Sequence, residues 1–372
     1  MRRLGVLGGG QLGRMLVQQA TCYPLIVTVL DPDASAPCRP FCEAFTVGDF
    51  RDAQEVLEWG KQCEVVTIEI ENVSLEGLKL LQEQGVRVVP EPEALEIIVD
   101  KGLQKKFYQE LGLATVPFLL ADTPEAIRQA RAEGYVFQKL RRSGYDGYGV
   151  RDLEKSPVPL EGPSVMEQKI EIAAELAVLA ARDIFGNTVT YPVVDMVFHP
   201  QAHRLSYQMC PSSLPDAIQE QARDWATAII ENLALTGLLA VEFLLGTDGR
   251  LWVNECAPRP HNSGHHTIEA FDISQFDMLL RIVQEMPVRQ PYMRFPSAMV
   301  NILGAPGAEG VPDYAGFLKS TDGQGVFIHL YGKNRVKPLR KMGHLTLVDS
   351  RLELLVRKAA QLAETAYIHA LS

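Results

Sequence analysis

Residues 240–267 read AVEFLLGTDGRLWVNECAPRPHNSGHHT, and this stretch decides how the rest of the chain is interpreted. Glu242 lies in an apolar run typical of a strand, a glycine-containing turn follows, and a second apolar run leads into Asn254 and Glu255. Two neighbouring antiparallel strands would bring these three oxygen-bearing side chains to one face. Mg²⁺ takes oxygen ligands, uses few protein carboxylates and leaves its other positions to water and phosphate. The stretch therefore predicts a metal–nucleotide site, with a hairpin that carries a solvated acidic face as the alternative.

The segment after the second apolar run is dense in side chains that bind anions or move protons. These side chains are Arg259, His261, Asn262, Ser263, His265 and His266. We therefore expect an anion-binding loop beside the metal. The loop favours the metal–nucleotide interpretation, because paired carboxylates alone are common by chance.

The bulk composition is that of a globular protein with more than one domain. The chain has 372 residues, of which 47% are hydrophobic and 22% charged, and this length allows two or three domains. No apolar run reaches the roughly 18 residues of a membrane helix, and the start has no signal-peptide cleavage pattern, so we expect a cytoplasmic protein without a membrane partner. The six cysteines are scattered, which favours reduced thiols over disulfides. The net charge of −10 argues against nucleic-acid binding, so an anionic substrate needs a local basic pocket.

The first hundred residues alternate between strand and helix patterns, which predicts a parallel sheet covered by helices. Strands are expected at 4–7, 25–30, 65–70 and 86–89, and a helix at 14–20. Between the first strand and the helix, Gly8, Gly10 and Gly13 match the GxGxxG dinucleotide fingerprint, and Asp31 ends the next strand. Three interpretations stay open: an NAD(P) site, a site for another phosphate, or a structural tight turn.

Residues 100–181 predict a nucleotide site on a small α/β unit. A basic helix runs from Asp100 to near Gly112, and a strand at 134–140 carries Lys139. The following RRSGYDGYG combines glycines with cations, which suits a mobile lid over phosphates; a plain glycine-rich hairpin is the alternative. The strand at 164–170 can offer backbone groups to an adenine ring, and Glu175 beyond it can hold ribose hydroxyls.

Taken in order, these segments resemble the ATP-grasp superfamily and, within it, the 5-(carboxyamino)imidazole ribonucleotide synthases. The resemblance spans nearly the whole chain. It is carried by GVLGGGQLGRM (5–15), TIEIENV (67–73), RRSGYDGYG (141–149), AVEF (240–243), VNECAPRPHNSGHHTIEA (253–270), FPSAMVNILG (295–304) and YGKNRVKPLRKMGH (331–344). It implies an α/β ATP-grasp fold. The expected parts are an N-terminal Rossmann-like (preATP-grasp) domain at 1–97, an ATP-grasp domain at 98–285 with a lid subdomain at about 115–168, and a small β-rich C-terminal domain at 286–372.

The resemblance also implies a set of site residues at the matching positions. ATP would be bound by Lys101, Lys139, Gly144, Tyr145, Asp146, Gly147, Tyr148, Gly149, Glu167, Gln168, Lys169, Ile170, Glu175, His199, Asn254 and Glu255. The ribonucleotide would be bound by Gln11, Leu12, Glu69, Asn262, Lys333, Arg340 and Lys341, with His261 beside them. Glu242 and Glu255 would hold Mg²⁺, and Arg259, His261 and Asp146 would be catalytic. Ser143 and Tyr148 depart from the usual lid pattern, which has a second glycine and a cation there.

The implied activity is the ATP- and bicarbonate-dependent carboxylation of 5-aminoimidazole ribonucleotide in purine biosynthesis, by way of carboxyphosphate. The implied partners are ATP, bicarbonate, the ribonucleotide and Mg²⁺, with a homodimer as the assembly and a downstream mutase as the acceptor of the product. The glycine loop would then serve the ribonucleotide instead of NAD. Two alternatives remain at this point: another ATP-grasp ligase, such as the formate-dependent glycinamide ribonucleotide transformylase, and a non-catalytic NAD-type binding protein. The run PRPHNSGH together with GYDG argues against the former, and the Glu242/Glu255 pair against the latter.

Overall fold

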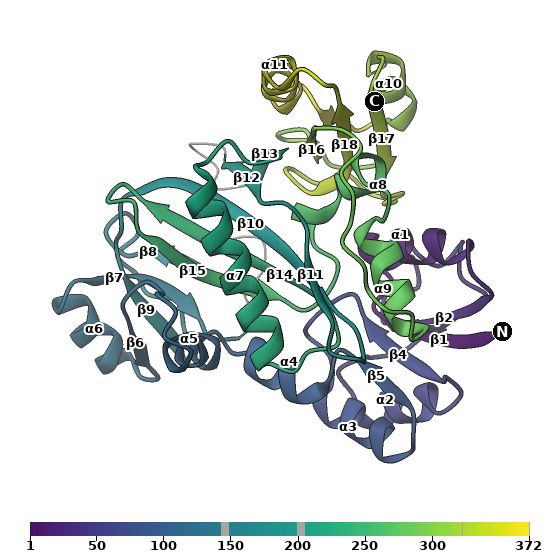
Figure 1. Cartoon of the computed structure of the whole chain (residues 1–372), viewed down its shortest axis with the longest axis horizontal. Coiled ribbons are helices and arrows are strands. Elements are labelled where there is room, and N and C mark those ends of the chain that lie inside the picture. The colour runs from purple at the N-terminus through teal and green to yellow at the C-terminus, as the bar shows by residue number, and fades with distance from the viewer. Residues whose placement is uncertain (143–148, 199–204, 322, 372) are drawn as a thin grey trace.

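The computed structural model describes residues 1–142, 149–198, 205–321 and 323–371. Its N-terminal part is a parallel five-stranded sheet of strand order β3-β2-β1-β4-β5 (Figure 1). The strands are β1 (Arg2–Leu7), β2 (Leu25–Asp31), β3 (Ala44–Val47), β4 (Val65–Ile68) and β5 (Arg87–Val89), and the helices are α1 (Gln11–Ala20), α2 (Ala53–Gly60), α3 (Leu75–Glu83) and α4 (Pro92–Ile98). Helix α1 packs on one face, while α2 and α3 pack on the other. The predicted alternation and the parallel sheet are confirmed.

A small antiparallel sheet of order β6-β9-β7-β8 follows helix α5 (Lys101–Glu110). Its elements are β6 (Phe118–Ala121), α6 (Pro124–Ala132), β7 (Tyr135–Leu140), β8 (Val150–Asp152) and β9 (Ser164–Gln168). Ile127 of α6 and Met166 of β9 belong to one buried cluster, so the helix covers one face of this sheet. The other face of β7 and β9 carries Lys139 and Glu167, which point toward α5 and β15.

The largest sheet in the described part of the chain has ten strands and joins two of the expected domains. The strands are β10 (Ile172–Arg182), β11 (Thr188–Thr190), β12 (Val194–Phe198), β13 (Leu205–Cys210), β14 (Gly237–Gly246), β15 (Leu251–Ala257), β16 (Ser297–Gly304), β17 (Val326–Leu330), β18 (Lys341–Val348) and β19 (Tyr367–Ile368). The main path is β15-β14-β10-β12-β13-β16-β18-β17. Because β13 pairs with β16, the C-terminal part extends this sheet. The C-terminal part also contains helices α10 (Tyr314–Ser320) and α11 (Leu352–Ala363).

The central sheet is buried on both faces. Along β10, Leu176 and Val178 pack against helix α7 (Asp216–Asn232), whereas Ala177 and Leu179 lie in the cluster shared with α1 and α9 (Gln275–Val283). Figure 1 shows α7 lying along the sheet, with α9 between this sheet and strands β1 and β2 of the N-terminal domain. Such burial explains the continuous apolar run of this strand. Among the described residues, no helix combines the length and the apolar character needed to cross a membrane.

Candidate active site

The predicted metal residues lie at an irregularity in the pairing of β14 with β15. Glu242 pairs directly with Glu255, but the next pair in the antiparallel register is Phe243 with Val253. Asn254 is therefore the extra residue of a β-bulge. Bulges are common beside active sites because they change the direction of a side chain within a strand.

The bulge explains why three oxygen-bearing side chains share one face. Val253 and Cys256 both pack in the cluster beneath α7, although a regular strand would send residues three apart to opposite faces. The two residues between them, Asn254 and Glu255, consequently both point away from α7. Glu242 also points away, because Phe243, its neighbour in β14, lies in the α7 cluster. We call this set of Glu242, Asn254 and Glu255 the oxygen face.

Two lysines from different elements reach the oxygen face. Lys101, at the start of α5, forms an ion pair with Glu255. Lys139 of β7 places its Nζ 2.9 Å from Asn254 Oδ1 and 2.8 Å from Glu167 Oε2. Asp100, the N-cap of α5, accepts hydrogen bonds from the backbone N–H groups of Gly102 and Leu103, which fixes the start of the helix that carries Lys101.

The charges on the oxygen face are unequal. Lys101 lowers the pKa of the Glu255 carboxyl, so Glu255 is ionised. Burial raises the pKa of Glu242, and the nearby Glu255 and Glu175 carboxylates raise it further. Burial also raises the pKa of Glu175 to about 7. Three carboxyl groups thus compete for few counter-charges, and added positive charge would allow all of them to ionise.

The oxygen face fits a magnesium ion whose ligands come partly from the protein and partly from a phosphate. Within the described residues, no three His, Cys, Asp or Glu side chains gather closely enough to hold a metal by themselves. Mg²⁺ does not need such a cage, because it is commonly held by one or two carboxylates together with substrate phosphates and water. Glu242 and Glu255 supply that donor set, and the lysines beside them suit the phosphates.

The glycine loop is already occupied by carboxylates of the protein. Glu69 accepts hydrogen bonds from the backbone N–H groups of Gly10 (3.0 Å) and Gly13 (2.8 Å), and Asp31 accepts one from Gly9 (2.6 Å). Gly8 has a φ of +98°, a backbone conformation that residues with a side chain rarely adopt, so a glycine is favoured there. Burial raises the pKa of Glu69 to about 7 despite the two N–H donors. A carboxylate thus fills the anion position that the dinucleotide fingerprint reserves for a phosphate.

The predicted ribonucleotide residues of the loop differ in what they can offer a ligand. The remaining N–H groups of the first turn of α1 belong to Gln11 and Leu12. Leu12 is 7% exposed and its side chain belongs to the core, so a ligand would meet only its backbone. Gln11 is half-buried at the start of the helix and can offer its side chain as well.

The histidine-rich segment after β15 is held by a network of short contacts. His261 places its Nε2 3.6 Å from Glu242 Oε1. Gln275 accepts from the backbone N–H of His261 at 2.8 Å and donates to its carbonyl at 2.9 Å, while its Nε2 lies 3.1 Å from His265 Nδ1. His261 also caps the short 3-10 helix Asn262–Gly264. His261 and Asn262 therefore have a defined position beside the oxygen face.

Arg259, the predicted anion-binding arginine, has an acidic partner that the sequence did not reveal. Its Nη2 lies 2.7 Å from Glu71 Oε1. Glu71 belongs to the segment after β4, so this ion pair joins the N-terminal domain to the loop that follows β15. Glu71 stands two residues after Glu69 in TIEIENV, but no pattern in the sequence marks it as the partner of Arg259.

The C-terminal segment between β17 and β18 lies against helix α1. Arg14 of α1 donates to the Tyr331 carbonyl at 2.9 Å, and the Lys333 carbonyl accepts from Tyr314 Oη at 2.8 Å. Lys333 and Arg340 lie in the loop between the two strands, and Lys341 begins β18. The segment therefore runs beside the helix whose first turn carries Gln11 and Leu12.

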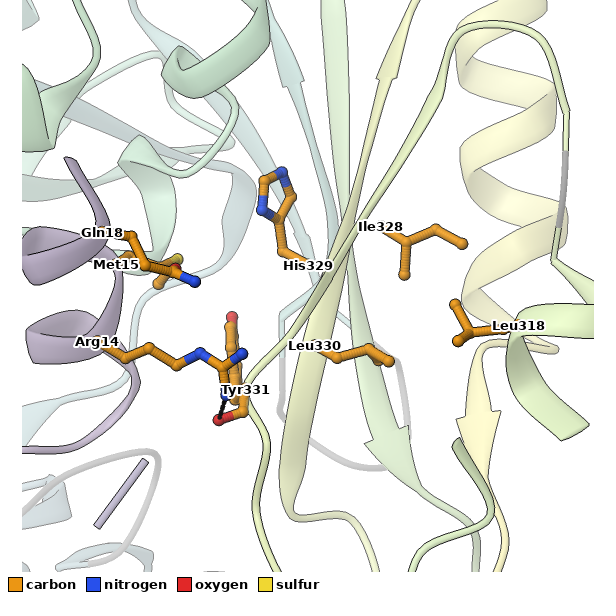
Figure 2. Close-up of a pocket in the computed structure, with 8 residues that line it drawn as sticks. All are labelled: Arg14, Met15, Gln18, Leu318, Ile328, His329, Leu330 and Tyr331. Carbon is orange, nitrogen blue, oxygen red and sulfur yellow. Dashed lines mark hydrogen bonds between the residues drawn. The ribbon is translucent and has the colours of Figure 1, made fainter. Parts of the chain in front are cut away.

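A pocket of about 240 Å³ lies between α1 and β17, apart from the oxygen face (Figure 2). Its lining comprises Arg14, Met15, Gln18, Leu318, Ile328, His329, Leu330 and Tyr331. The ring of His329 stacks on His344 at a centroid distance of 4.4 Å, and His344 stacks on His265 at 4.5 Å. None of the predicted site residues in the described part of the chain lines this pocket.

Some of the remaining predicted residues lie outside the described part of the chain, and the others can be placed by their contacts. Gly144, Tyr145, Asp146, Gly147, Tyr148 and His199 lie outside the described residues. Gly149 accepts a hydrogen bond from the Leu140 N–H at 2.8 Å. The backbone N–H of Gln168 donates to the Pro117 carbonyl, and Ile170 packs near Leu244 and Trp252. The Lys169 side chain forms an ion pair with Glu154 at 2.7 Å. Sequence reasoning missed Lys105, which is buried beside Glu167.

Comparisons with known proteins agree with this architecture. Three family models match successive parts of the chain: a ribonucleotide synthetase preATP-grasp domain (1–99), an ATP-grasp domain (106–276) and a phosphoribosylaminoimidazole carboxylase C-terminal domain (297–358). The N5-carboxyaminoimidazole ribonucleotide synthase of Synechococcus elongatus is 34% identical, with 93% of this chain and 89% of the relative covered.

Two solved structures are similar over nearly their whole length. The N5-carboxyaminoimidazole ribonucleotide synthetase of Thermus thermophilus has a TM-score of 0.84 and 34% identity, with 97% of this chain and 98% of that chain covered. The N5-carboxyaminoimidazole synthase of Aspergillus clavatus, in complex with ADP and 5-aminoimidazole ribonucleotide, has a TM-score of 0.85 and 28% identity, with 98% of each chain covered.

Proposed function

This chain belongs to the N5-carboxyaminoimidazole ribonucleotide synthase family, and on that premise we propose that it carboxylates the amine of 5-aminoimidazole ribonucleotide at the expense of ATP. Its products are N5-carboxyaminoimidazole ribonucleotide, ADP and phosphate, and the reaction serves purine biosynthesis. The observation that carries the proposal is the oxygen face, where Glu242, Asn254 and Glu255 meet Lys101 and Lys139.

In this proposal, ATP binds between the small sheet β6-β9-β7-β8 and the oxygen face. Glu167, Gln168, Lys169 and Ile170 connect the two parts, and their backbone groups can meet the adenine ring. Glu175 then accepts from the ribose hydroxyls, and Lys101 and Lys139 contact the phosphates. Phosphoryl transfer depends mainly on positioning and on neutralising charge, which such a constellation supplies. Mg²⁺ would be held by Glu242 and Glu255 and would neutralise phosphate charge when bound.

Bicarbonate is a poor electrophile and is activated by phosphorylation. One of its oxygens attacks the γ-phosphorus of ATP, the bond to ADP breaks, and carboxyphosphate forms. The amine of the ribonucleotide then takes the carboxyl group, with release of phosphate and a proton. Arg259 would hold the planar anion, since a guanidinium fork matches a carboxylate. To do so it must share or exchange its contact with Glu71, which lies 2.7 Å away.

The ribonucleotide lies between α1 and the C-terminal segment in this proposal. The first turn of α1 offers Gln11 and Leu12, while Lys333, Arg340 and Lys341 supply positive charge for the 5′-phosphate. Asn262 and His261 approach from the side of the oxygen face, where His261 lies 3.6 Å from Glu242. Glu69 acts on this site through the backbone it holds, since its two oxygens accept from Gly10 and Gly13.

We also propose a cellular location, an assembly and a metal requirement for the enzyme. We place it in the cytoplasm, as a homodimer that depends on Mg²⁺ and passes its unstable product to a mutase. The domain division 1–97, 98–285 and 286–372 is part of the proposal, and the three family models, which leave residues 100–105 and 277–296 unmatched, support it. Asp146 remains a proposed catalytic residue, and Tyr148 a proposed ATP contact.

One coupled assay tests the function. ADP release should require both bicarbonate and 5-aminoimidazole ribonucleotide, and it should stop when Mg²⁺ is chelated. ADP release that instead requires formate and glycinamide ribonucleotide would assign the chain to the alternative ligase. Binding of NAD without turnover of ATP would favour the non-catalytic alternative.

A further inference from the structure

Glu167 lies between two lysines that come from different parts of the fold. Its Oε1 is 2.5 Å from Lys105 Nζ of α5, and its Oε2 is 2.8 Å from Lys139 Nζ of β7. Burial alone would raise the pKa of Glu167, but the two ammonium groups outweigh it and the pKa lies below its usual value. The carboxylate is therefore ionised and shared between the lysines.

Lys105 is fixed more firmly than either of the lysines at the oxygen face. It is 2% exposed, and its Nζ also donates to Thr115 Oγ1 at 2.8 Å. Thr115 Oγ1 in turn donates to the Val253 carbonyl at 2.8 Å, on the strand that carries the bulge. Lys105 therefore joins α5, β9 and β15 from the inside of the protein.

The net charge of the triad formed by Lys105, Glu167 and Lys139 depends on Lys105. Two ammonium groups and one carboxylate leave a single positive charge on this triad. If Lys105 were absent, Glu167 would neutralise Lys139, and that lysine would be drawn to the glutamate and away from a phosphate. Burying an ion without a counter-charge is costly, so Lys139 would become the obligatory partner of Glu167.

We infer that Lys105 is a positioning residue for nucleotide binding: it supplies the counter-charge of Glu167 and thereby keeps the charge of Lys139 available to the phosphates of ATP. Lys105 acts through Glu167, because its side chain is enclosed on the inner side of the triad. The inference rests on the proposed function, in which Lys139 contacts those phosphates.

The first experiment compares Lys105→Met with Lys106→Met. Lys106 is the next residue of the same helix and is exposed, so its replacement controls for the loss of one positive charge. Calorimetric titration with ADP and Mg²⁺ should show an affinity lower by about tenfold or more for Lys105→Met, because a hydrogen bond to a charged group contributes on this order. The KM for 5-aminoimidazole ribonucleotide should stay within about twofold of the wild type, since additivity holds for distant sites.

The double variant Lys105→Met/Glu167→Gln distinguishes charge from packing. With a neutral residue at 167, Lys139 no longer has a carboxylate that draws it away from the phosphates, so the affinity for ADP should recover toward the wild-type value. A structural role of Lys105 predicts the opposite, because a second buried substitution would add to the damage. Thermal unfolding of each variant shows whether it is folded before the titration is interpreted.

Two results would contradict the inference about Lys105, and a third would contradict the proposed function. If the wild type and Lys106→Met bind ADP while Lys105→Met binds it equally well, the inference is wrong and the function stands. A double variant that binds ADP more weakly than Lys105→Met also overturns the inference. If the wild type itself does not bind ADP, the proposed function fails.

Discussion

Glu242 and Glu255 face each other across β14 and β15, and the slip in register next to this pair places Asn254 on their side of the sheet. A regular strand would have sent either Asn254 or Glu255 into the apolar layer beneath α7, where Val253 and Cys256 lie. One additional residue in β15 therefore assembles the oxygen face. Side chains alternate between the two faces of a strand, so one additional residue reverses the face on which every later side chain lies.

The Glu255→Gln variant tests the metal role of the oxygen face. The substitution keeps the shape of the side chain but removes the negative charge that pairs with Lys101 and would hold Mg²⁺. We expect ADP release to fall by at least about a hundredfold, since charge stabilisation in phosphoryl transfer is worth several kcal/mol. Glu231→Gln, at an exposed glutamate of α7, is the matched control. Near-normal ADP release by Glu255→Gln would remove Glu255 from the metal site.

The pH dependence of ADP binding tests Glu175. Burial raises the pKa of this carboxyl to about 7, so it is partly protonated at neutral pH. An ionised Glu175 accepts from ribose hydroxyls better than a protonated one, so the affinity for ADP should rise between about pH 6 and pH 8. ADP itself titrates in this range, so Glu175→Gln provides the reference. Equal slopes for the wild type and this variant would show that Glu175 does not titrate on binding.

The stability of the glycine loop should depend on pH through Glu69. Glu69→Ala removes the acceptor of two N–H groups and should lower the free energy of unfolding by about 1 kcal/mol, as the loss of a helix cap does. Burial raises the folded-state pKa to about 7, above that of the unfolded chain. Protonation of Glu69 therefore stabilises the fold, and this stabilisation is lost as the pH rises through about 7.

The measurement is thermal or urea unfolding of the wild type and Glu69→Ala at about pH 5 and pH 8. The destabilisation should be larger at the lower pH. Glu83→Ala, at an exposed glutamate near the end of α3, should show no such difference. A destabilisation that grows with rising pH would contradict the raised pKa.

Arg340→Ala tests which phosphate the C-terminal segment binds. We expect the KM for 5-aminoimidazole ribonucleotide to rise by about tenfold or more, because a charge-assisted bond to the 5′-phosphate is lost. The KM for ATP should change little. Arg335→Ala is the control, since Arg335 is exposed in the same loop and meets Arg340 through its carbonyl. Equal weakening for both substrates would move the segment to the ATP site.

The sequence predicted those parts of the fold that follow a simple period. The strand at 25–30 was expected from its apolar run and is β2, and the helix expected from residue 100 is α5. The sequence also predicted a β-rich C-terminal domain, but it did not show that β16 of this domain pairs with β13 and continues the central sheet. A pairing between strands almost a hundred residues apart leaves no local signal in the sequence.

The sequence named several residues that the structure brings together, but it did not show the contacts among them. Glu242, Asn254 and Glu255 could be named from their spacing, yet the bulge that aligns them depends on the register of two strands. Lys105 looked like one more cation of a basic helix, and only its burial beside Glu167 distinguishes it from Lys106. The partner of Arg259 belongs to another domain, so Glu71 could be found only in three dimensions.

The carboxylate of Glu69 has a consequence for the ligands that the N-terminal domain rejects. Cells contain abundant dinucleotides, whose pyrophosphate seeks the N–H groups of such a glycine loop. Here Gly10 and Gly13 already donate to Glu69, so an entering pyrophosphate would have to displace a buried acid and would meet its negative charge once it ionises. We therefore expect the loop to disfavour dinucleotides because Glu69 already occupies the position of the phosphate, without any contact that recognises the dinucleotide itself.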